Sequence, residues 1–255
     1  MLLTNGCSFV WGDELIGYDD DPPSHKHHTF THKLAELLGC EYVNLGTCGA
    51  GNAKIFRDTI HYLRDPKNPK PTHIVILWSA WQRGEVAENH PESFDVQRNI
   101  QRWQCMTQIS PARVHNLKKE LRDPLDRMYD HYDATRTGII QTLSYMEAME
   151  MLCDSLGIKL IQGIFHQLAY QNFLDSIHRR YRKNHWSPWV DWVMDTHANL
   201  KKTSKIGLGF YQDMFSMAEE KYTVRPFGHP DEDTHTEYAQ LLHHIFNTQF
   251  DESEE

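Results

Sequence analysis

The chain has 255 residues, of which 40% are hydrophobic and 24% charged, a composition typical of a globular domain that buries one core. Its formal net charge of -9 at pH 7 argues against a general attraction to nucleic acid or to anionic membranes, and no apolar run is long enough to span a bilayer. We therefore expect neither nucleic acid nor membrane among its partners.

The first part of the chain predicts strands that alternate with helices. Apolar runs that stop at glycine-containing turns are typical of buried strands, and apolar residues at helical spacing indicate helices that pack on them. In chain order, we predict a strand at residues 1–5, a helix at 31–38 closed by Gly39, a strand at 41–45, a helix at 53–63 and a strand at 73–78.

The rest of the chain predicts an insertion and then a return to the same alternation. Residues 84–137 are polar, aromatic and interrupted by proline, so we expect a partly helical insertion there. Residues 166–221 are rich in aromatic side chains, and their pattern does not allow helices or strands to be assigned. The later elements are predicted as a helix at 139–156, a strand at 158–165, a final helix at 233–250 and a solvated acidic tail at 251–255.

Such an order of elements predicts the fold class. Strands joined to helices by short connections favour a mostly parallel sheet between two helical layers. We therefore predict an α/β fold, a three-layer α/β/α sandwich in which residues 1–250 form one domain. Sites in these sheets gather at the carboxyl ends of the strands, so the loops with Ser8, Gly49–Asn52 and Ser79–Arg83 should converge.

Ser8 is the candidate nucleophile. It follows the first predicted strand and lies between Gly6 and Gly12, in a turn that can expose its hydroxyl above the sheet. Serine in a glycine-containing turn is also a common turn former. The prediction therefore depends on the groups that the fold brings beside Ser8.

The loop after the second predicted strand contains groups that such a nucleophile needs. Gly49 and Gly51 let backbone N–H groups approach a developing oxyanion closely, and Asn52 adds a side-chain amide that could bind substrate. Glycines in a strand-to-helix turn, with Asn52 as the N-cap, are the structural alternative.

A histidine loop near the C-terminus is the candidate source of a general base. His229 precedes Pro230, which restricts its loop, and the final helix follows at once. A histidine held in this way can take a proton from a serine hydroxyl. We predict His229 as the base and keep His235, expected in the first turn of the helix, as the alternative.

Together these segments resemble the SGNH hydrolases, also called the GDSL esterase and lipase family. The similar blocks, in the family's order, are Gly6-Cys7-Ser8, Asn44-Leu45-Gly46-Thr47-Cys48-Gly49 and Gly228-His229-Pro230. The resemblance covers residues 1–83 and about 158–250, and it identifies the chain as a divergent member. It implies the family's flavodoxin-like topology, Ser8 as nucleophile, His229 as base, and the amides of Ser8 and Gly49 as oxyanion donors.

The chain departs from the family pattern at an oxyanion donor. Ala80 stands where the family has an asparagine. Gln82, two residues further on, could supply the amide instead, or the donor is lost. Loss of one such donor typically costs about 10²–10³ in rate.

The chain also departs from the family pattern at the acid that orients the base. Pro226 stands where the family has its acid, three residues before the histidine. Asp231, Asp233 and Glu232 follow His229 and remain candidates, as does a Ser-His dyad with no carboxylate.

These residues predict a serine esterase. We expect it to release a short acyl group from a carbohydrate or another small molecule, with Trp81 stacking on a sugar ring. The departures at Ala80 and Pro226 leave one alternative open, an SGNH-fold protein of impaired catalysis that binds a ligand or has a structural role.

No cofactor is predicted. The five cysteines are scattered and form no CxxC pair, which disfavours a disulfide framework and a zinc knuckle, and we expect the histidines near residues 25–28 to lie in a solvated loop. The N-terminus has no secretory signal pattern, so we expect a cytoplasmic protein. Together with the short SGNH-like blocks and the Trp-rich insertion, this indicates a protein from a bacterium or a bacteriophage.

Overall fold

The structure is a computed structural model. It describes residues 1–15, 27–81, 83–87, 106–109, 134–164, 188–208, 212–221 and 229–250.

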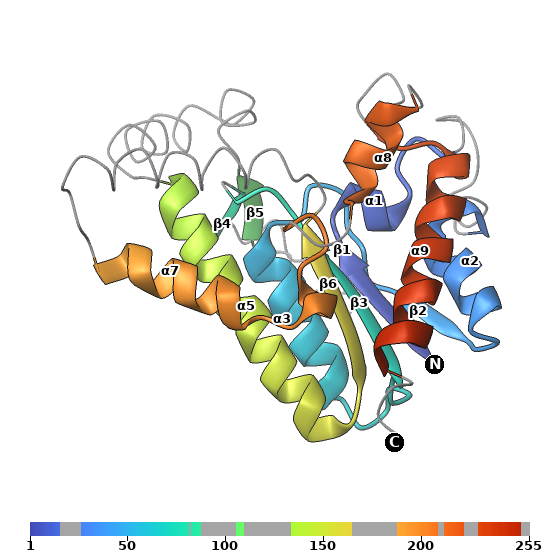
Figure 1. The fold of residues 1–255 in the computed structure, drawn as a ribbon, viewed down its shortest axis with the longest axis horizontal. Helices are drawn as coiled ribbons and strands as arrows, with labels where there is room; N and C mark the ends of the chain where they lie inside the picture. The colour runs from blue at the N-terminus through green and yellow to red at the C-terminus, as the bar shows by residue number, and fades with distance from the viewer. Residues whose placement is uncertain are drawn as a thin grey trace.

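A parallel sheet of four strands forms the centre of the protein (Figure 1). Its order is β2-β1-β3-β6, as in the flavodoxin-like topology that we predicted. The strands are β1 (Leu2–Gly6), β2 (Tyr42–Asn44), β3 (His73–Trp78) and β6 (Lys159–Ile164). Because the chain passes from β1 to β2 on one side and then to β3 on the other, β1 is the topological switch point. Ser8 follows this strand.

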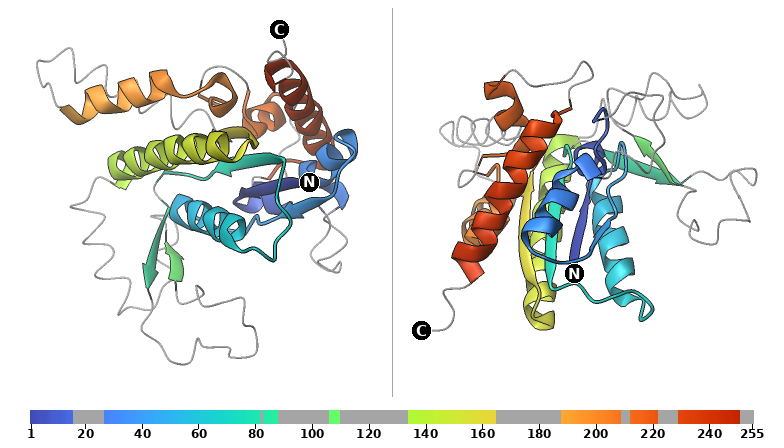
Figure 2. Two further views of the ribbon diagram at one scale, coloured as in Figure 1. Left: turned by 90° about the horizontal axis from the view of Figure 1, so that it is seen from below. Right: turned by 90° about the vertical axis from the view of Figure 1, so that its right-hand side faces the viewer.

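Helices cover both faces of the sheet, so the predicted three-layer α/β/α class is confirmed (Figures 1 and 2). One layer contains α3 (Asn52–Arg64), α5 (Ala134–Leu156) and α7 (Pro188–Asn199). The other contains α1 (Ser8–Trp11), α2 (Phe30–Leu37), α8 (Met214–Glu220) and α9 (Glu232–Phe250).

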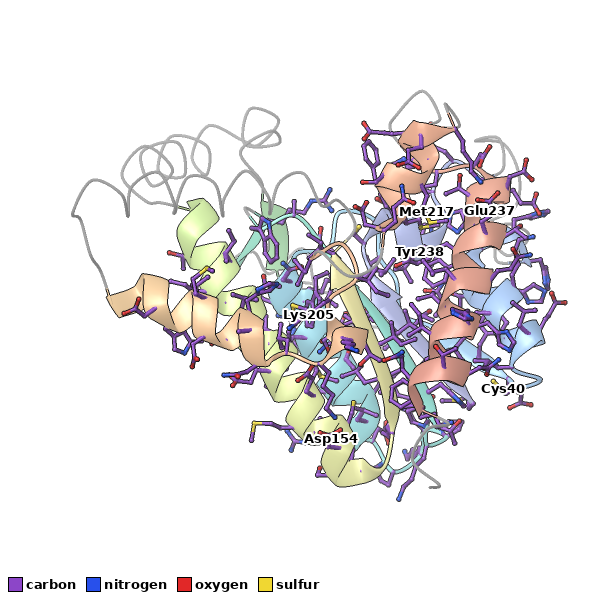
Figure 3. The ribbon with its side chains drawn as sticks, in the orientation of Figure 1. Cys40, Asp154, Lys205, Met217, Glu237 and Tyr238 are labelled. Carbon is purple, nitrogen blue, oxygen red and sulfur yellow. The ribbon has the colours of Figure 1, made fainter. Side chains whose placement is uncertain are left out.

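Alternation along the strands explains the two layers. Successive strand residues point to opposite faces, so Leu2 packs in the core under α2 and α9 while Leu3 packs in the core under α3 and α5. Both leucines are completely buried. Tyr238 of α9 is also fully buried and packs on the α2 and α9 face (Figure 3).

The described part of the predicted insertion contains both strand and helix. We expected residues 84–137 to be partly helical, and the first turn of α5 covers 134–137. The sequence did not predict the antiparallel ladder in which β4 (Gly84–Ala87) pairs with β5 (Met106–Ile109). Helix α5 begins at Ala134, ahead of the predicted start at 139. The other residues of the insertion and the acidic tail at 251–255 lie outside the described residues.

Three described elements lie in residues 166–221, for which no helix or strand was predicted: α7, α8 and a short 3-10 helix. Helix α7 packs on α5, and the short 3-10 helix η4 (Lys202–Ser204) lies beside β6, where Gly163 bridges to Ile206. Among the described residues, no helix is both long and apolar enough to cross a membrane.

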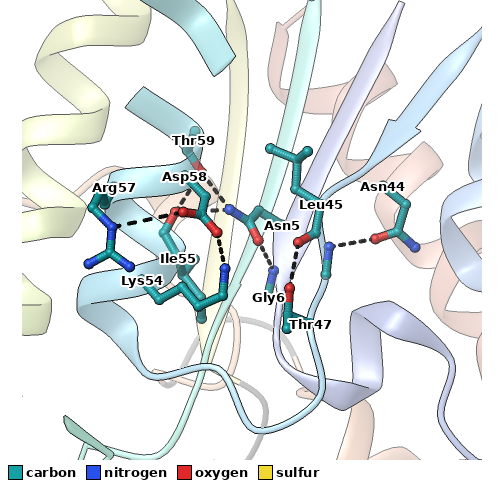
Figure 4. A network of polar contacts seen from close by, with 11 residues as sticks. Asn5, Gly6, Asn44, Leu45, Thr47, Lys54, Ile55, Arg57, Asp58 and Thr59 are labelled. Carbon is teal, nitrogen blue, oxygen red and sulfur yellow. Dashed lines mark hydrogen bonds and ion pairs between the residues drawn. The ribbon is translucent and has the colours of Figure 1, made fainter. Parts of the chain in front are cut away.

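Buried amides attach the neighbouring helix and loops to the carboxyl end of β1 (Figure 4). The Asn5 side chain donates to the carbonyl of Ile55 and to Thr59 Oγ1, both at 2.9 Å, and accepts from the amide of Gly6 at 2.8 Å. These bonds satisfy a polar group that would be costly to bury unpaired, and they hold α3 beside the strand that precedes Ser8.

Candidate active site

A tight turn after β1 presents Ser8. Cys7 is the N-cap of α1, Ser8 is its first residue, and Gly12 closes this single turn at φ 86°. The carbonyl of Ser8 accepts hydrogen bonds from the amides of Gly12 and Asp13 at 2.9 and 3.0 Å. These bonds fix the backbone of Ser8, and only 7% of the residue is exposed.

His229 reaches this serine from the segment that precedes α9. Its Nε2 lies 2.8 Å from Ser8 Oγ, within the range for proton transfer between a nucleophile and a base. The ring is held edge to face against Phe9, with centroids 5.3 Å apart. The structure thus brings together the two residues that we predicted as nucleophile and base.

Glu14 lies on the other side of the imidazole. Its Oε2 is 2.7 Å from His229 Nδ1 and also accepts from the His229 backbone amide at 3.3 Å. Only 8% of the Glu14 side chain is exposed. The acid therefore comes from the loop after β1 that also carries Ser8.

These contacts determine which nitrogen of His229 carries the proton. An ionised carboxylate can only accept, so Nδ1 is the donor to Glu14. In the neutral ring Nε2 is then the acceptor, and Ser8 Oγ–H donates to it. This is the tautomer that a general base for a serine hydroxyl requires.

The backbone of Glu14 is strained. It is the only non-glycine residue with positive φ, at 65°, in the described part of the chain. A non-glycine residue in this left-handed region costs about 1–3 kcal/mol, and such strain gathers at functional sites. The conformation places the Glu14 carboxylate on Nδ1 of His229, which explains why the strain is retained.

Asp13 approaches the same imidazole from the serine side. Its Oδ2 lies 3.7 Å from His229 Nε2, and 38% of its side chain is exposed. Two carboxylates therefore face this ring, one buried at Nδ1 and one open to solvent near Nε2.

The loop after β2 packs directly against the Ser8 turn. The amide of Thr47 donates to the carbonyl of Gly6 at 3.1 Å, and the Asn44 side chain donates to the carbonyl of Val10 at 2.7 Å. A Cβ at Gly46 would lie 2.7 Å from the amide nitrogen of Trp11, so only glycine fits there. Gly49 of this loop is buried at φ 78°, and its role as oxyanion donor stays a prediction.

Asn52 has a positioning role. Its amide donates to the carbonyl of Ser79 and to Thr142 Oγ1, at 3.2 and 2.7 Å, and its oxygen accepts from the Ser79 amide at 2.6 Å. Both donor hydrogens are thus used inside the protein. In place of the predicted contact with substrate, we assign Asn52 to holding the loop after β3 against α3 and α5.

The predicted role of Trp81 is also corrected. Trp81 is 3% exposed and belongs to the core under α3 and α5, so its ring cannot stack on a sugar. The backbone of Trp81 meets α5 so closely that a Cβ at Gly138 would lie 1.8 Å from its carbonyl oxygen. Gln82, the predicted substitute oxyanion donor, lies outside the described residues.

His235, the alternative base, does not reach Ser8. It is 1% exposed inside α9, and its Nδ1 accepts from the amide of Phe30 at 3.0 Å. This alternative is therefore wrong, because the first turn of α9 directs the ring into the core.

Two of the candidate acids after His229 have other partners, and the third, Asp233, is exposed. Asp231 accepts from the amide and hydroxyl of Thr234 and so caps α9, while Glu232 pairs with Lys33 and His28. Neither is needed beside His229, since Glu14 occupies its Nδ1 side. Glu14 was missed by sequence reasoning, and the signal for it was the acidic pair Asp13-Glu14 directly after Gly12.

Acid should weaken folding through His235. Burial, together with the charge of Lys33, lowers the pKa of His235 to about 3. Between that pKa and the ordinary value of 6.5, His235 is protonated in the unfolded chain but neutral in the folded chain. The free energy of unfolding therefore falls as the pH falls. We expect this residue to cost about 2 kcal/mol between pH 7 and pH 5.

Urea unfolding at both pH values measures this loss. His235→Asn keeps an acceptor for the Phe30 amide but does not titrate, so it should lose about 2 kcal/mol less than the natural chain. Equal acid sensitivity of the two proteins would contradict the assignment.

Among the described residues, no group of three or more His, Cys, Asp or Glu side chains could hold a metal ion. The histidine-containing loop near residue 25 lies partly outside these residues.

Comparisons with known proteins concern the fold. No protein-family model matches the chain, and no curated protein sequence matches it either. A lipolytic protein of the G-D-S-L family from Desulfitobacterium hafniense aligns over 96% of this chain and 98% of its own, with 10% identity and a TM-score of 0.40. A member of the same family from Veillonella parvula aligns over 97% and 98%, with 12% identity and a TM-score of 0.43.

A third similar structure is a carbohydrate esterase family 2 enzyme with a carbohydrate-binding domain, from Corynascus (Myceliophthora fergusii). It aligns over 98% of this chain and 66% of its own, with 11% identity and a TM-score of 0.46.

Proposed function

We propose that this protein is a serine hydrolase that cleaves carboxylic ester bonds, with Ser8 as nucleophile, His229 as general base and Glu14 as the acid that orients the imidazole. The main support for this proposal is a continuous series of short contacts. Ser8 Oγ lies 2.8 Å from His229 Nε2, and His229 Nδ1 lies 2.7 Å from Glu14 Oε2. Nucleophile, base and orienting acid in this order are the requirement for serine-based acyl transfer.

The acylation step follows from these contacts. His229 Nε2 takes the proton of Ser8 Oγ while the oxygen forms a bond to the ester carbonyl carbon, and the carbonyl oxygen gains the negative charge. When the carbon–oxygen bond to the alcohol breaks, the Nε2 proton passes to the leaving oxygen. Glu14 stabilises the imidazolium that exists between these two transfers.

Deacylation repeats the sequence with water. His229 takes a proton from a water molecule while the water oxygen attacks the carbonyl carbon of the acyl-enzyme. The proton passes to Ser8 Oγ as the bond to the acyl group breaks and the carboxylic acid product is released. We assign the amides of Ser8 and Gly49 as donors to the oxyanion in both steps, because the Ser8 turn and the loop after β2 are bonded to each other beside Ser8.

The substrate that we propose is an ester of a short acyl group with a carbohydrate or another small alcohol. Phe9 stacks on Phe215 of α8 with ring centroids 6.0 Å apart and contacts the His229 ring by its edge. Aromatic rings thus fill one side of the imidazole, which favours a small acyl group such as acetyl over a long chain.

A fluorophosphonate reagent tests the proposal directly, because it reacts with a serine only where a base activates the hydroxyl. We expect labelling of the natural chain at Ser8, and no labelling of Ser8→Ala. Ser155→Ala, which changes an exposed serine on α5, is the matched control and should label fully. A folded protein that neither labels nor hydrolyses short acyl esters would support the ligand-binding alternative.

A further inference from the structure

Asp13 has a place in the site that the hydrolysis steps leave unused. Its carboxylate lies 3.7 Å from His229 Nε2, on the side of Ser8, and it is the more exposed of the two acids at this ring, at 38% against 8% for Glu14. Of the basic side chains that the structure describes, only His229 approaches this carboxylate. A charged acceptor is thus open to solvent beside the reacting atoms.

We infer that Asp13 is a specificity-determining residue that binds a hydrogen-bond donor on the alcohol part of the ester, next to the ester oxygen. This inference rests on the proposed function. In this role, Asp13 favours esters whose alcohol carries a neighbouring hydroxyl and disfavours esters whose alcohol carries a negative charge.

The position of the leaving alcohol supports this role. The alcohol oxygen must come within about 3 Å of His229 Nε2 to receive its proton. Asp13 Oδ2 lies 3.7 Å from the same nitrogen, so the leaving oxygen and the Asp13 carboxylate are both close to His229 Nε2. In the alcohol part, a hydroxyl on the carbon next to the one that bears the ester oxygen is then within reach of Asp13.

The charge of Asp13 explains the discrimination. A carboxylate accepts but cannot donate, and a hydrogen bond to a charged group is stronger than one between neutral groups. A hydroxyl of the alcohol gains such a bond, whereas a carboxylate of the alcohol meets a like charge at short range. Glu14 already holds His229 at Nδ1, so Asp13 is not needed to orient the ring.

Three acetate esters of similar size test the inference. In 2-hydroxyethyl acetate the alcohol carries a neighbouring hydroxyl, in propyl acetate it carries a methyl group, and in O-acetylglycolate it carries a carboxylate. For the natural chain, we expect kcat/KM to be about 10- to 100-fold higher for 2-hydroxyethyl acetate than for propyl acetate, and lowest for O-acetylglycolate.

Variants at Asp13 should change the ratios between these substrates. Asp13→Ala should lower the ratio of 2-hydroxyethyl acetate to propyl acetate about 10- to 100-fold, and Asp13→Asn, which keeps an acceptor oxygen without the charge, should lower it less. Both should raise O-acetylglycolate relative to propyl acetate. Glu41→Ala removes an exposed carboxylate at the opposite end of the sheet and should leave the ratios unchanged.

The ratios separate this role from an effect through His229. If Asp13→Ala lowered kcat for all three esters equally, with both ratios preserved, Asp13 would act on the imidazole and the inference would be overturned. A natural chain that hydrolyses all three esters at equal rates would overturn it as well, while Ser8→Ala still tested the proposed function separately. Absence of any Ser8-dependent hydrolysis would overturn both.

Discussion

Glu14→Gln should lower kcat for ester hydrolysis by about 10³–10⁴, although Glu14 never touches the substrate. The carboxylate fixes the His229 tautomer with the proton on Nδ1, at 2.7 Å, and stabilises the imidazolium formed during each proton transfer. A neutral amide of the same size removes the charge and can present an N–H to Nδ1, which would favour the wrong tautomer.

Glutamine is the suitable replacement because it tolerates the left-handed backbone of Glu14 no better and no worse than glutamate, so the strain at φ 65° is retained. Steady-state kinetics with a short acyl ester measures the effect, and KM should change much less than kcat. Glu232→Gln, which alters a carboxylate paired with Lys33 outside the site, is the control and should keep its kcat. If Glu14→Gln kept a tenth of the natural kcat, Glu14 would not be the orienting acid.

Ser8→Ala should lower hydrolysis by about 10⁴ or more and should abolish the covalent acyl-enzyme. The reason is chemical: Ser8 Oγ is the atom that His229 Nε2 deprotonates across 2.8 Å, and alanine leaves no nucleophile in its place. Rapid mixing followed by mass spectrometry of the intact protein should detect an acetylated natural chain and an unmodified variant.

The double variant Ser8→Ala with Glu14→Gln sharpens this result. Residues of one catalytic unit are strongly non-additive, so the second change should cost almost nothing once Ser8 is absent. Fully additive losses would mean that Glu14 acts elsewhere than on the Ser8–His229 pair. Ser155→Ala again serves as the control for loss of a serine.

The sheet and its helices were predictable because the signals for them are local. β3 (His73–Trp78) is almost entirely apolar, as a strand buried on both faces must be, and its bounds agree with the prediction at both ends. Helix α9 (Glu232–Phe250) starts one residue before its predicted start and ends where the apolar periodicity ends. Strands β4 and β5 were not predicted, because four-residue strands with mixed composition carry little periodic signal.

The positions of Ser8 and His229 at the carboxyl end of the sheet could also be predicted, since parallel connections deliver the loops to one edge. The sequence alone could not identify the acid. Its candidates lay next to His229 in the chain, at Asp231, Glu232 and Asp233, whereas Glu14 lies 215 residues away. Glu14 and His229 become neighbours only because the segment before α9 packs against the Ser8 turn.

Burial decided the remaining assignments. The sequence places Trp81 and His235 in loops or turns near the site, where either could face a ligand, yet both side chains are packed in the two cores. A pattern of residue types determines which elements form and which edge carries the chemistry. Which side chain points into that edge depends on contacts between segments far apart in the chain, such as α5 against Trp81 and Phe30 against His235.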